Sequence, residues 1–338
     1  MKLQSLFTAI LVVGTLPVLG TAGQEQKTAD QNPGAASAAP AAAQPDSSKP
    51  DGDYVGSDVC VTCHEAQHKS FEHTIMGNAM AHPRSADAAR GCESCHGPGK
   101  AHVEAGGGKD TIPVRFTAGS NNTVEEKNAA CLSCHSKGNQ MFWRGSSHES
   151  RAMACVDCHT VHYGSPAERY AALGSESRYS MPLSEHVGTK KPQPELCLSC
   201  HQMRRAQLQR SSHMPYREGK VTCTSCHNPH GSPNPSQLLQ ATVNENCYSC
   251  HAERRGPFLW EHPPVMENCA NCHDPHGSSN PQLLKVRMPR VCDSCHDSSR
   301  HPTQPQPLSS IKNFNRGCTN CHSSIHGSNH PSGNAFLR

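Results

Sequence analysis

The feature that most constrains this chain is the pentapeptide Cys-x-x-Cys-His, which occurs ten times and uses all 20 cysteines. In such a pentapeptide both thiols bond covalently to the edge of a c-type haem, and the histidine binds the iron from one face. Structural zinc sites take four thiolates, or two thiolates and two distant histidines, and need no histidine after every second cysteine. A disulfide framework would leave the adjacent histidines unexplained. The sequence therefore predicts ten c-type haems.

Each pentapeptide supplies two covalent attachment points and one proximal iron ligand. The predicted attachment cysteines are Cys60, Cys63, Cys92, Cys95, Cys131, Cys134, Cys155, Cys158, Cys197, Cys200, Cys223, Cys226, Cys247, Cys250, Cys269, Cys272, Cys292, Cys295, Cys318 and Cys321. The predicted proximal ligands are His64, His96, His135, His159, His201, His227, His251, His273, His296 and His322.

A second histidine is available for every iron, so the sequence predicts bis-histidine ligation. The pentapeptides form five two-haem units that begin near residues 60, 131, 197, 247 and 292. In every unit one spare histidine lies between the two pentapeptides, and another follows the second pentapeptide. The ten predicted distal ligands are His73, His102, His148, His162, His213, His230, His262, His276, His301 and His326.

Some of these distal candidates cannot bind the haem of their own pentapeptide. His162, His230 and His276 each come three residues after a proximal histidine. A histidine so placed cannot pass around the ring to the far face of its own haem. We therefore expect these histidines to bind neighbouring haems, which would hold the haems close together along the chain.

The first unit offers several candidates for the distal ligand. His68 and His82 lie near His73 in the sequence, as do Met76 and Met80. A methionine ligand would raise the potential of that haem. The sequence leaves these alternatives to His73 open.

Composition indicates that haem forms much of the interior. Hydrophobic residues are 34% of the chain and aromatic residues 4%, whereas glycine and proline contribute 26 residues each. So little apolar side chain cannot offset the entropy lost when the chain is ordered. We therefore predict a multihaem cytochrome c fold, mostly coil with short α-helices and little or no β-structure, in which five two-haem repeats form an elongated linear haem array.

Three segments are expected. Residues 1–23 are predicted to be a signal peptide, because an apolar run follows Lys2 and small residues follow that run. Residues 24–53 are rich in Ala and Pro and predict a disordered linker. Residues 54–338 form the decahaem domain. An export signal agrees with c-type haem, which is attached outside the cytoplasm, so the expected location is the periplasm.

The charge of the chain gives no support to a nucleic-acid partner. The formal net charge is only +3. Each haem would add two propionates, so the basic side chains are best explained as propionate partners.

The strings GCESCHGPGKAHVEAGG (91–107), GPFLWEHPPVMENCANCHDPHGSSNPQLL (256–284) and GCTNCHSSIHGSNHPSG (317–333) carry a resemblance to a known family. Over residues 55–338 the chain resembles the decahaem cytochromes of the MtrA, PioA and DmsE family. The resemblance implies an electron wire inside a porin-cytochrome conduit of the outer membrane, sheathed by a β-barrel. It also implies a periplasmic or inner-membrane cytochrome on one side, and an extracellular multihaem cytochrome or an external acceptor or donor such as iron on the other.

We expect an electron-transfer protein rather than an enzyme, with no catalytic residues. Two histidines on every iron would leave no open position for a substrate. No segment after the signal peptide is apolar enough to cross lipid, so direct lipid contact is not expected and a partner would have to line the path. The alternatives are a soluble periplasmic electron shuttle and a multihaem reductase, which would need a five-coordinate haem.

Overall fold

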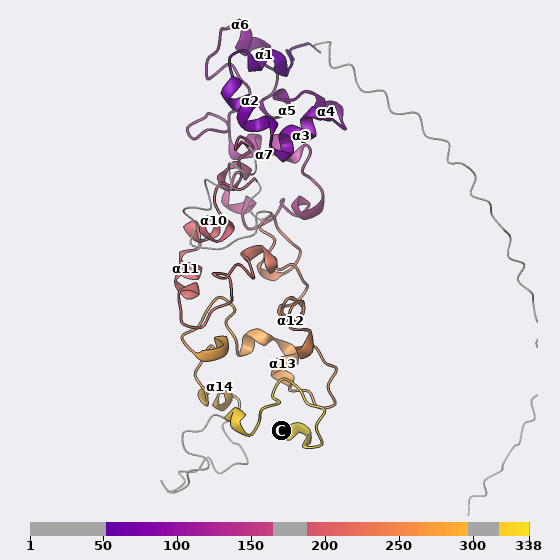
Figure 1. The fold of residues 1–338 in the computed structure, drawn as a ribbon, viewed down its shortest axis with the longest axis vertical. Coiled ribbons are helices and arrows are strands. Elements are labelled where there is room, and N and C mark those ends of the chain that lie inside the picture. Colours follow the sequence, from indigo (N-terminus) through magenta and orange to yellow (C-terminus); the bar gives the residue numbers. More distant parts are fainter. Residues whose placement is uncertain (1–51, 165–187, 297–317, 338) are drawn as a thin grey trace, which may run out of the picture. The chain divides into compact units, whose positions relative to one another are not determined.

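A computed structural model describes residues 52–164, 188–296 and 318–337 (Figure 1). All of these residues belong to one unit, Pro45–Arg338. The predicted signal peptide lies outside the described residues, as do nearly all of the predicted linker and the distal candidate His301.

The described chain consists of short helices and turns joined by loops (Figure 1). The α-helices are α1 (Ser57–Val61), α2 (Glu65–Glu72), α3 (Ile75–Ala81), α4 (Ala86–Ala89), α5 (Glu93–His96), α6 (Lys100–Glu104), α7 (Val124–Leu132), α8 (Cys155–Cys158), α10 (Gln193–Cys200), α11 (Gln202–Leu208), α12 (Val243–Tyr248), α13 (Pro263–Glu267) and α14 (Arg290–Asp293). The 3-10 turns are η1 (Gly138–Gln140), η2 (Glu149–Arg151), η4 (Cys223–Ser225), η5 (Pro235–Gln237), η6 (Ala252–Arg254), η7 (Cys269–Asn271), η8 (Pro281–Leu283), η9 (Cys318–Asn320) and η10 (Gly333–Ala335).

Extended structure in the described ranges is limited to isolated bridges between single residues, among them Ser212 with Ser278 and Trp260 with Ser328. The predicted fold class, mostly coil and short helix with little β-structure, is confirmed. In the same ranges no helix is long and apolar enough to cross a membrane.

Two of the helices that precede attachment sites begin with a capping box. At the start of α7, Thr123 Oγ1 accepts from the Glu126 amide at 3.2 Å, and Glu126 Oε2 accepts from the Thr123 amide at 2.9 Å. At the start of α12, Thr242 and Glu245 make the same pair of bonds at 3.1 and 3.2 Å. These caps satisfy amides that a helix start would otherwise leave unpaired, so helices of this length can form.

A buried carboxylate organises the first unit. Glu93, which is 4% exposed, accepts hydrogen bonds from the amides of Val55, Gly56 and Gly99 at 3.0, 2.9 and 2.7 Å. Hydrogen bonds to a charged acceptor are stronger than neutral ones. The chain before α1 and the chain before α6 are therefore held at the helix that carries the second pentapeptide.

Successive units meet through backbone contacts. Ser212 and Ser278 exchange hydrogen bonds at 3.0 and 2.8 Å, joining the third unit to the fourth, and Trp260 and Ser328 join the fourth to the fifth at 3.0 and 2.9 Å. Beside the first contact, a Cβ placed on Gly277 would lie 2.2 Å from the Gln207 carbonyl oxygen. Only glycine allows this approach of two backbones.

The apolar core of the described chain is small. The buried hydrophobic residues form one cluster, Leu198, Leu208 and Tyr216, with the partly buried Val221 packed against it, and a few scattered side chains. Many other large apolar side chains are exposed, including Leu259 at 78% and Met203 at 74%. A polypeptide with so few buried apolar contacts gains little free energy from burial, so most of its stability has to come from bound haem.

The chain without haem is therefore expected to be unfolded. When it is expressed in a strain that lacks haem attachment, limited proteolysis should degrade residues 54–338 at the rate of a denatured protein, and near-ultraviolet circular dichroism should show no fixed tertiary packing. A protease-resistant apoprotein would contradict this expectation.

Gly277→Ala should weaken the junction between the third and fourth units. Overlap with the Gln207 carbonyl requires the backbones to separate, at a cost of about 2–4 kcal/mol. Guanidinium unfolding of the holoprotein would measure the loss. Gly106→Ala is the matched control, because Gly106 also has a positive φ but has open space around it; it should cost only about 1–2 kcal/mol.

Candidate haem-binding site

Every pentapeptide forms one helical turn. In each of them the backbone N–H of the histidine donates to the backbone carbonyl of the first cysteine, four residues earlier, at an N···O distance of 2.8–3.2 Å. Residues four apart in a helical turn lie on the same face. The first cysteine and the proximal histidine of each pentapeptide therefore present their side chains to the same side, as a shared haem requires.

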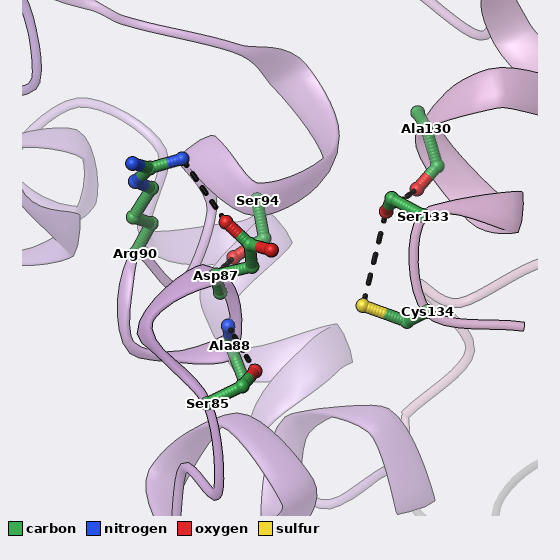
Figure 2. Close-up of polar contacts among 8 residues, drawn as sticks. All are labelled: Ser85, Asp87, Ala88, Arg90, Ser94, Ala130, Ser133 and Cys134. Atoms are coloured by element: carbon green, nitrogen blue, oxygen red, sulfur yellow. Dashed lines mark hydrogen bonds and ion pairs between the residues drawn. The ribbon is translucent and has the colours of Figure 1, made fainter.

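A hydroxyl side chain precedes the second cysteine in the first pentapeptide of every unit. Its oxygen donates to the carbonyl three residues earlier and lies 3.8–4.0 Å from the next thiol. Figure 2 shows this at Ser133, which bonds the Ala130 carbonyl and contacts Cys134 across from Ser94 of α5. The hydroxyl thus orients the second attachment thiol. The residues are Thr62, Ser133, Ser199, Ser249 and Ser294.

The two pentapeptides of a unit meet at their first cysteines. The thiols that hydrogen-bond one another are Cys60 with Cys92, Cys131 with Cys155, Cys197 with Cys223, Cys247 with Cys269, and Cys292 with Cys318. In three of these pairs the contact raises the pKa of the first thiol and lowers that of the second, namely Cys60 with Cys92, Cys131 with Cys155, and Cys247 with Cys269. Contact with Cys60 lowers the pKa of Cys92 to about 5.

The second cysteines of successive units lie near enough to influence each other electrostatically. Burial raises the pKa of one thiol at each junction, and a thiol of the next unit raises it further. These junctions pair Cys95 with Cys134, Cys158 with Cys200, Cys226 with Cys250, and Cys272 with Cys295. The attachment edges of neighbouring pentapeptides therefore alternate along the chain, with first cysteines adjacent within a unit and second cysteines adjacent between units.

Seven proximal histidines have a predicted distal histidine beside them. The ring-centre distances are 5.8–6.5 Å, and the planes are within 19–24° of parallel in five pairs. The pairs, proximal residue first, are His64 with His102, His96 with His162, His159 with His230, His201 with His148, His227 with His276, His273 with His326, and His296 with His262.

This separation fits one metal ion between two imidazoles. With a metal–nitrogen bond of about 2.0 Å on each side, the two ring centres stand about 6 Å apart. Rings in direct face-to-face contact would be closer, because van der Waals contact between carbon atoms occurs at about 3.5–4.0 Å. The observed pairs leave a gap of the size that an iron centre fills.

Several of the predicted ligand histidines, whether or not they belong to these pairs, are held in place by a hydrogen bond at ring nitrogen Nδ1. Nδ1 bonds a backbone carbonyl in His96 (Val114, 2.9 Å), His148 (Pro229, 2.7 Å), His159 (Gly188, 3.1 Å), His162 (Gln67, 3.2 Å), His227 (Ser236, 2.9 Å), His273 (Gln282, 2.8 Å) and His322 (Ala335, 2.5 Å). The carbonyl requires a proton on Nδ1, so Nε2 keeps the lone pair that a metal needs.

Two of these carbonyls belong to loops of similar sequence and length. After His227 and after His273 the chain runs through an HGS…NP turn and returns nine residues later, so that Ser236 and Gln282 present their carbonyls to the preceding histidine. Ser236 and Gln282 both have a positive φ, 55° and 53°. The left-handed residue turns the chain back toward the histidine.

Burial keeps several of these imidazoles neutral. Exclusion of water lowers the pKa of seven of them, and neighbouring histidines lower it further in most. Burial lowers the pKa of His230 to about 4. A neutral imidazole is the form that binds a metal. The seven are His96, His159, His201, His230, His262, His276 and His326.

Two further distal candidates, His73 and His213, have no proximal ring beside them among the described residues. His73 Nε2 lies 3.4 Å from Glu72, and His213 lies against Tyr216 with Glu218 at 3.8 Å. His301 is outside the described residues. In the first unit, the ring next to His64 is His102 rather than that of His68 or His82.

Sequence reasoning missed three buried polar residues that tie the attachment sites together. They are Glu93, Asn128 and Asn244, which are 4–6% exposed. A signal was present for the two asparagines, because each stands three residues before the first cysteine of its unit, in NAACLSCH and NENCYSCH. Glu93 occupies a variable position inside a pentapeptide and gave no such signal.

Comparison with known proteins finds matches over most of the chain. A family model described as a doubled CXXCH motif matches residues 213–256 and 262–301, and one described as cytochrome c-type protein NrfB-like matches residues 92–181. The chain is 40% identical over 293 residues to the multiheme cytochrome MtrA of Shewanella baltica (strain OS185), and the match covers 84% of this chain and 81% of that protein.

Removal of one distal histidine should open one iron. His276→Ala is expected to convert the haem attached at Cys223 and Cys226 to a high-spin form, visible by electron paramagnetic resonance, whereas His276→Met should stay low-spin with a raised potential. His82→Ala is the control, since His82 has no proximal ring beside it among the described residues and its Nδ1 lies 3.2 Å from the Asn78 carbonyl oxygen. A wild-type spectrum from His276→Ala would show that His276 is not a ligand.

Proposed function

The chain belongs to the family of the multihaem cytochrome MtrA and is an electron-transfer protein with c-type haems, and we propose that it holds ten of them as a wire across the outer membrane. The observation that carries this proposal is the set of histidine pairs, in which two imidazoles face each other with room for one iron. A haem iron bound on both faces exchanges electrons and offers no open position to a substrate.

The pairs support a general rule for ligation. A histidine between the two pentapeptides of one unit lies beside the first proximal histidine of the next unit, as His148 lies beside His201 and His262 beside His296. By this rule His73 would bind the iron held by His135, and His213 the iron held by His251.

Histidines that follow a second pentapeptide pair with the preceding unit instead of the next one. His230, His276 and their equivalents lie beside the second proximal histidine of the preceding unit. The two ends of the array lack a neighbour and close locally. At the amino-terminal end His102 lies beside His64, and at the other end His301 would bind the iron held by His322.

This ligation would make the polypeptide a chain of interlocked units. Six of the seven observed histidine pairs join two different units. Each such pair commits residues of two units to one iron, so neighbouring haems cannot separate without breaking a metal–ligand bond. The chain's own residues thereby keep successive centres at fixed, short distances over which electrons tunnel.

Passage through the outer membrane would need a partner. The described helices cannot span lipid, and loops with unpaired backbone groups cannot face hydrocarbon. A wide β-barrel with a polar interior would accommodate this chain. Resemblance to the porin-cytochrome family supports such a sheath, with a periplasmic or inner-membrane cytochrome at one end and an extracellular multihaem cytochrome, or iron, at the other.

Haem stoichiometry and membrane association test the proposal together. The purified protein should contain ten haems by pyridine haemochrome assay and mass spectrometry. All ten should be low-spin by electron paramagnetic resonance. The protein should also co-purify with a β-barrel from detergent-extracted outer membranes. Recovery only as a free periplasmic protein would instead indicate a shuttle. A high-spin haem that binds substrate would indicate a reductase.

A further inference from the structure

Asn244 uses its whole side-chain amide to connect the two attachment helices of the fourth unit. It lies in α12, three residues before Cys247, and is 6% exposed. Its Oδ1 accepts from the Cys269 amide at 2.7 Å. Its Nδ2 donates to the carbonyls of Val265 and Met266 at 2.9 and 3.0 Å. The helix of the first pentapeptide thus holds the starting point of the second.

Asn128 makes the same connection in the second unit. It lies in α7, three residues before Cys131, and is 5% exposed. Its Oδ1 accepts from the Cys155 amide at 2.8 Å, and its Nδ2 donates to the Met153 carbonyl at 3.0 Å. The two asparagines are therefore equivalent in position, burial and partners.

In two further units, other side chains accept a hydrogen bond from a backbone amide at the start of the second pentapeptide. In the first unit Ser57, also three residues before its cysteine, accepts from the Cys92 amide at 3.1 Å. In the third unit Pro194 occupies that position, and Gln193 accepts from the Thr224 amide at 3.0 Å instead. In these units a side chain just before the first cysteine therefore accepts a hydrogen bond from an amide at the start of the second pentapeptide, although the residue type differs.

The asparagines are not needed to cap their own helices. Thr123 with Glu126, and Thr242 with Glu245, already satisfy the amides at the starts of α7 and α12. The bonds of Asn128 and Asn244 instead cross to the second pentapeptide. Those bonds hold together the two backbones whose first thiols touch, Cys131 with Cys155 and Cys247 with Cys269.

We propose that Asn128 and Asn244 are positioning residues that set the distance and mutual orientation of the two haems within their units, and through this the electronic coupling between them. The inference rests on the proposed haem attachment. Both macrocycles of a unit are bonded to cysteines whose backbones the asparagine joins. A rotation or shift of one helix against the other would therefore move one ring against its neighbour.

The double variant Asn128→Ala/Asn244→Ala tests this in the intact holoprotein. Haem–haem distance and orientation control the exciton couplet in Soret-region circular dichroism, so the couplet should lose intensity or change shape while pyridine haemochrome still reports the wild-type haem content. Asn128→Ser/Asn244→Ser should restore the couplet, because a serine already makes the equivalent bond in the first unit.

Thr123→Ala/Thr242→Ala is the matched control, since it weakens the same two helices without touching the connection between pentapeptides. Loss of each cap should lower stability by about 1 kcal/mol and leave the couplet unchanged. An unchanged couplet in the alanine asparagine variant, or an equal change in the threonine variant, would overturn the proposal. Fewer than ten haems in the wild-type protein would instead refute the proposed function, and the two failures are thereby distinguishable.

Discussion

The fold depends on histidine rings that face each other across the boundaries between units at a separation that leaves room for one metal ion. A histidine three residues after its own proximal candidate cannot reach the far face of the same haem, and we propose that it binds an earlier one. His276, for example, lies beside His227 of the preceding unit. This local restriction gives the polypeptide its long-range connections, which a small apolar core could not supply.

The same arrangement links structure and proposed function. A protein that buried its haems in a large apolar core would separate them by side chains. Here the first cysteines of the two pentapeptides in a unit touch, as at Cys60 and Cys92, and the second cysteines of successive units lie near enough to influence each other electrostatically, as at Cys95 and Cys134. Polar groups hold segments in place where apolar packing would do so in another protein. Hydroxyl side chains orient thiols, backbone carbonyls orient imidazoles, and Asn128, Asn244 and Glu93 join segments through buried hydrogen bonds.

Much of the fold and part of the candidate site could be predicted from residues alone. Haem attachment requires two thiols and a histidine at fixed spacing, so ten repeats of Cys-x-x-Cys-His that use every cysteine predict c-type haem. The poor apolar content predicted short helices with little β-structure, and that fold class is confirmed. The distal ligands remain predictions, although the structure places seven of the ten candidates beside a proximal ring.

The sequence by itself determined the kind of cofactor and the doubled motif, and it predicts the attachment residues, because covalent bonding to haem depends on local spacing. Only the tertiary structure decided which histidine faces which, since His96 and His162, or His148 and His201, are brought together by loops whose path no local pattern encodes. It also showed that buried asparagines join paired pentapeptides, because a hydrogen bond between residues 25 or 27 positions apart depends on where the folded backbone returns.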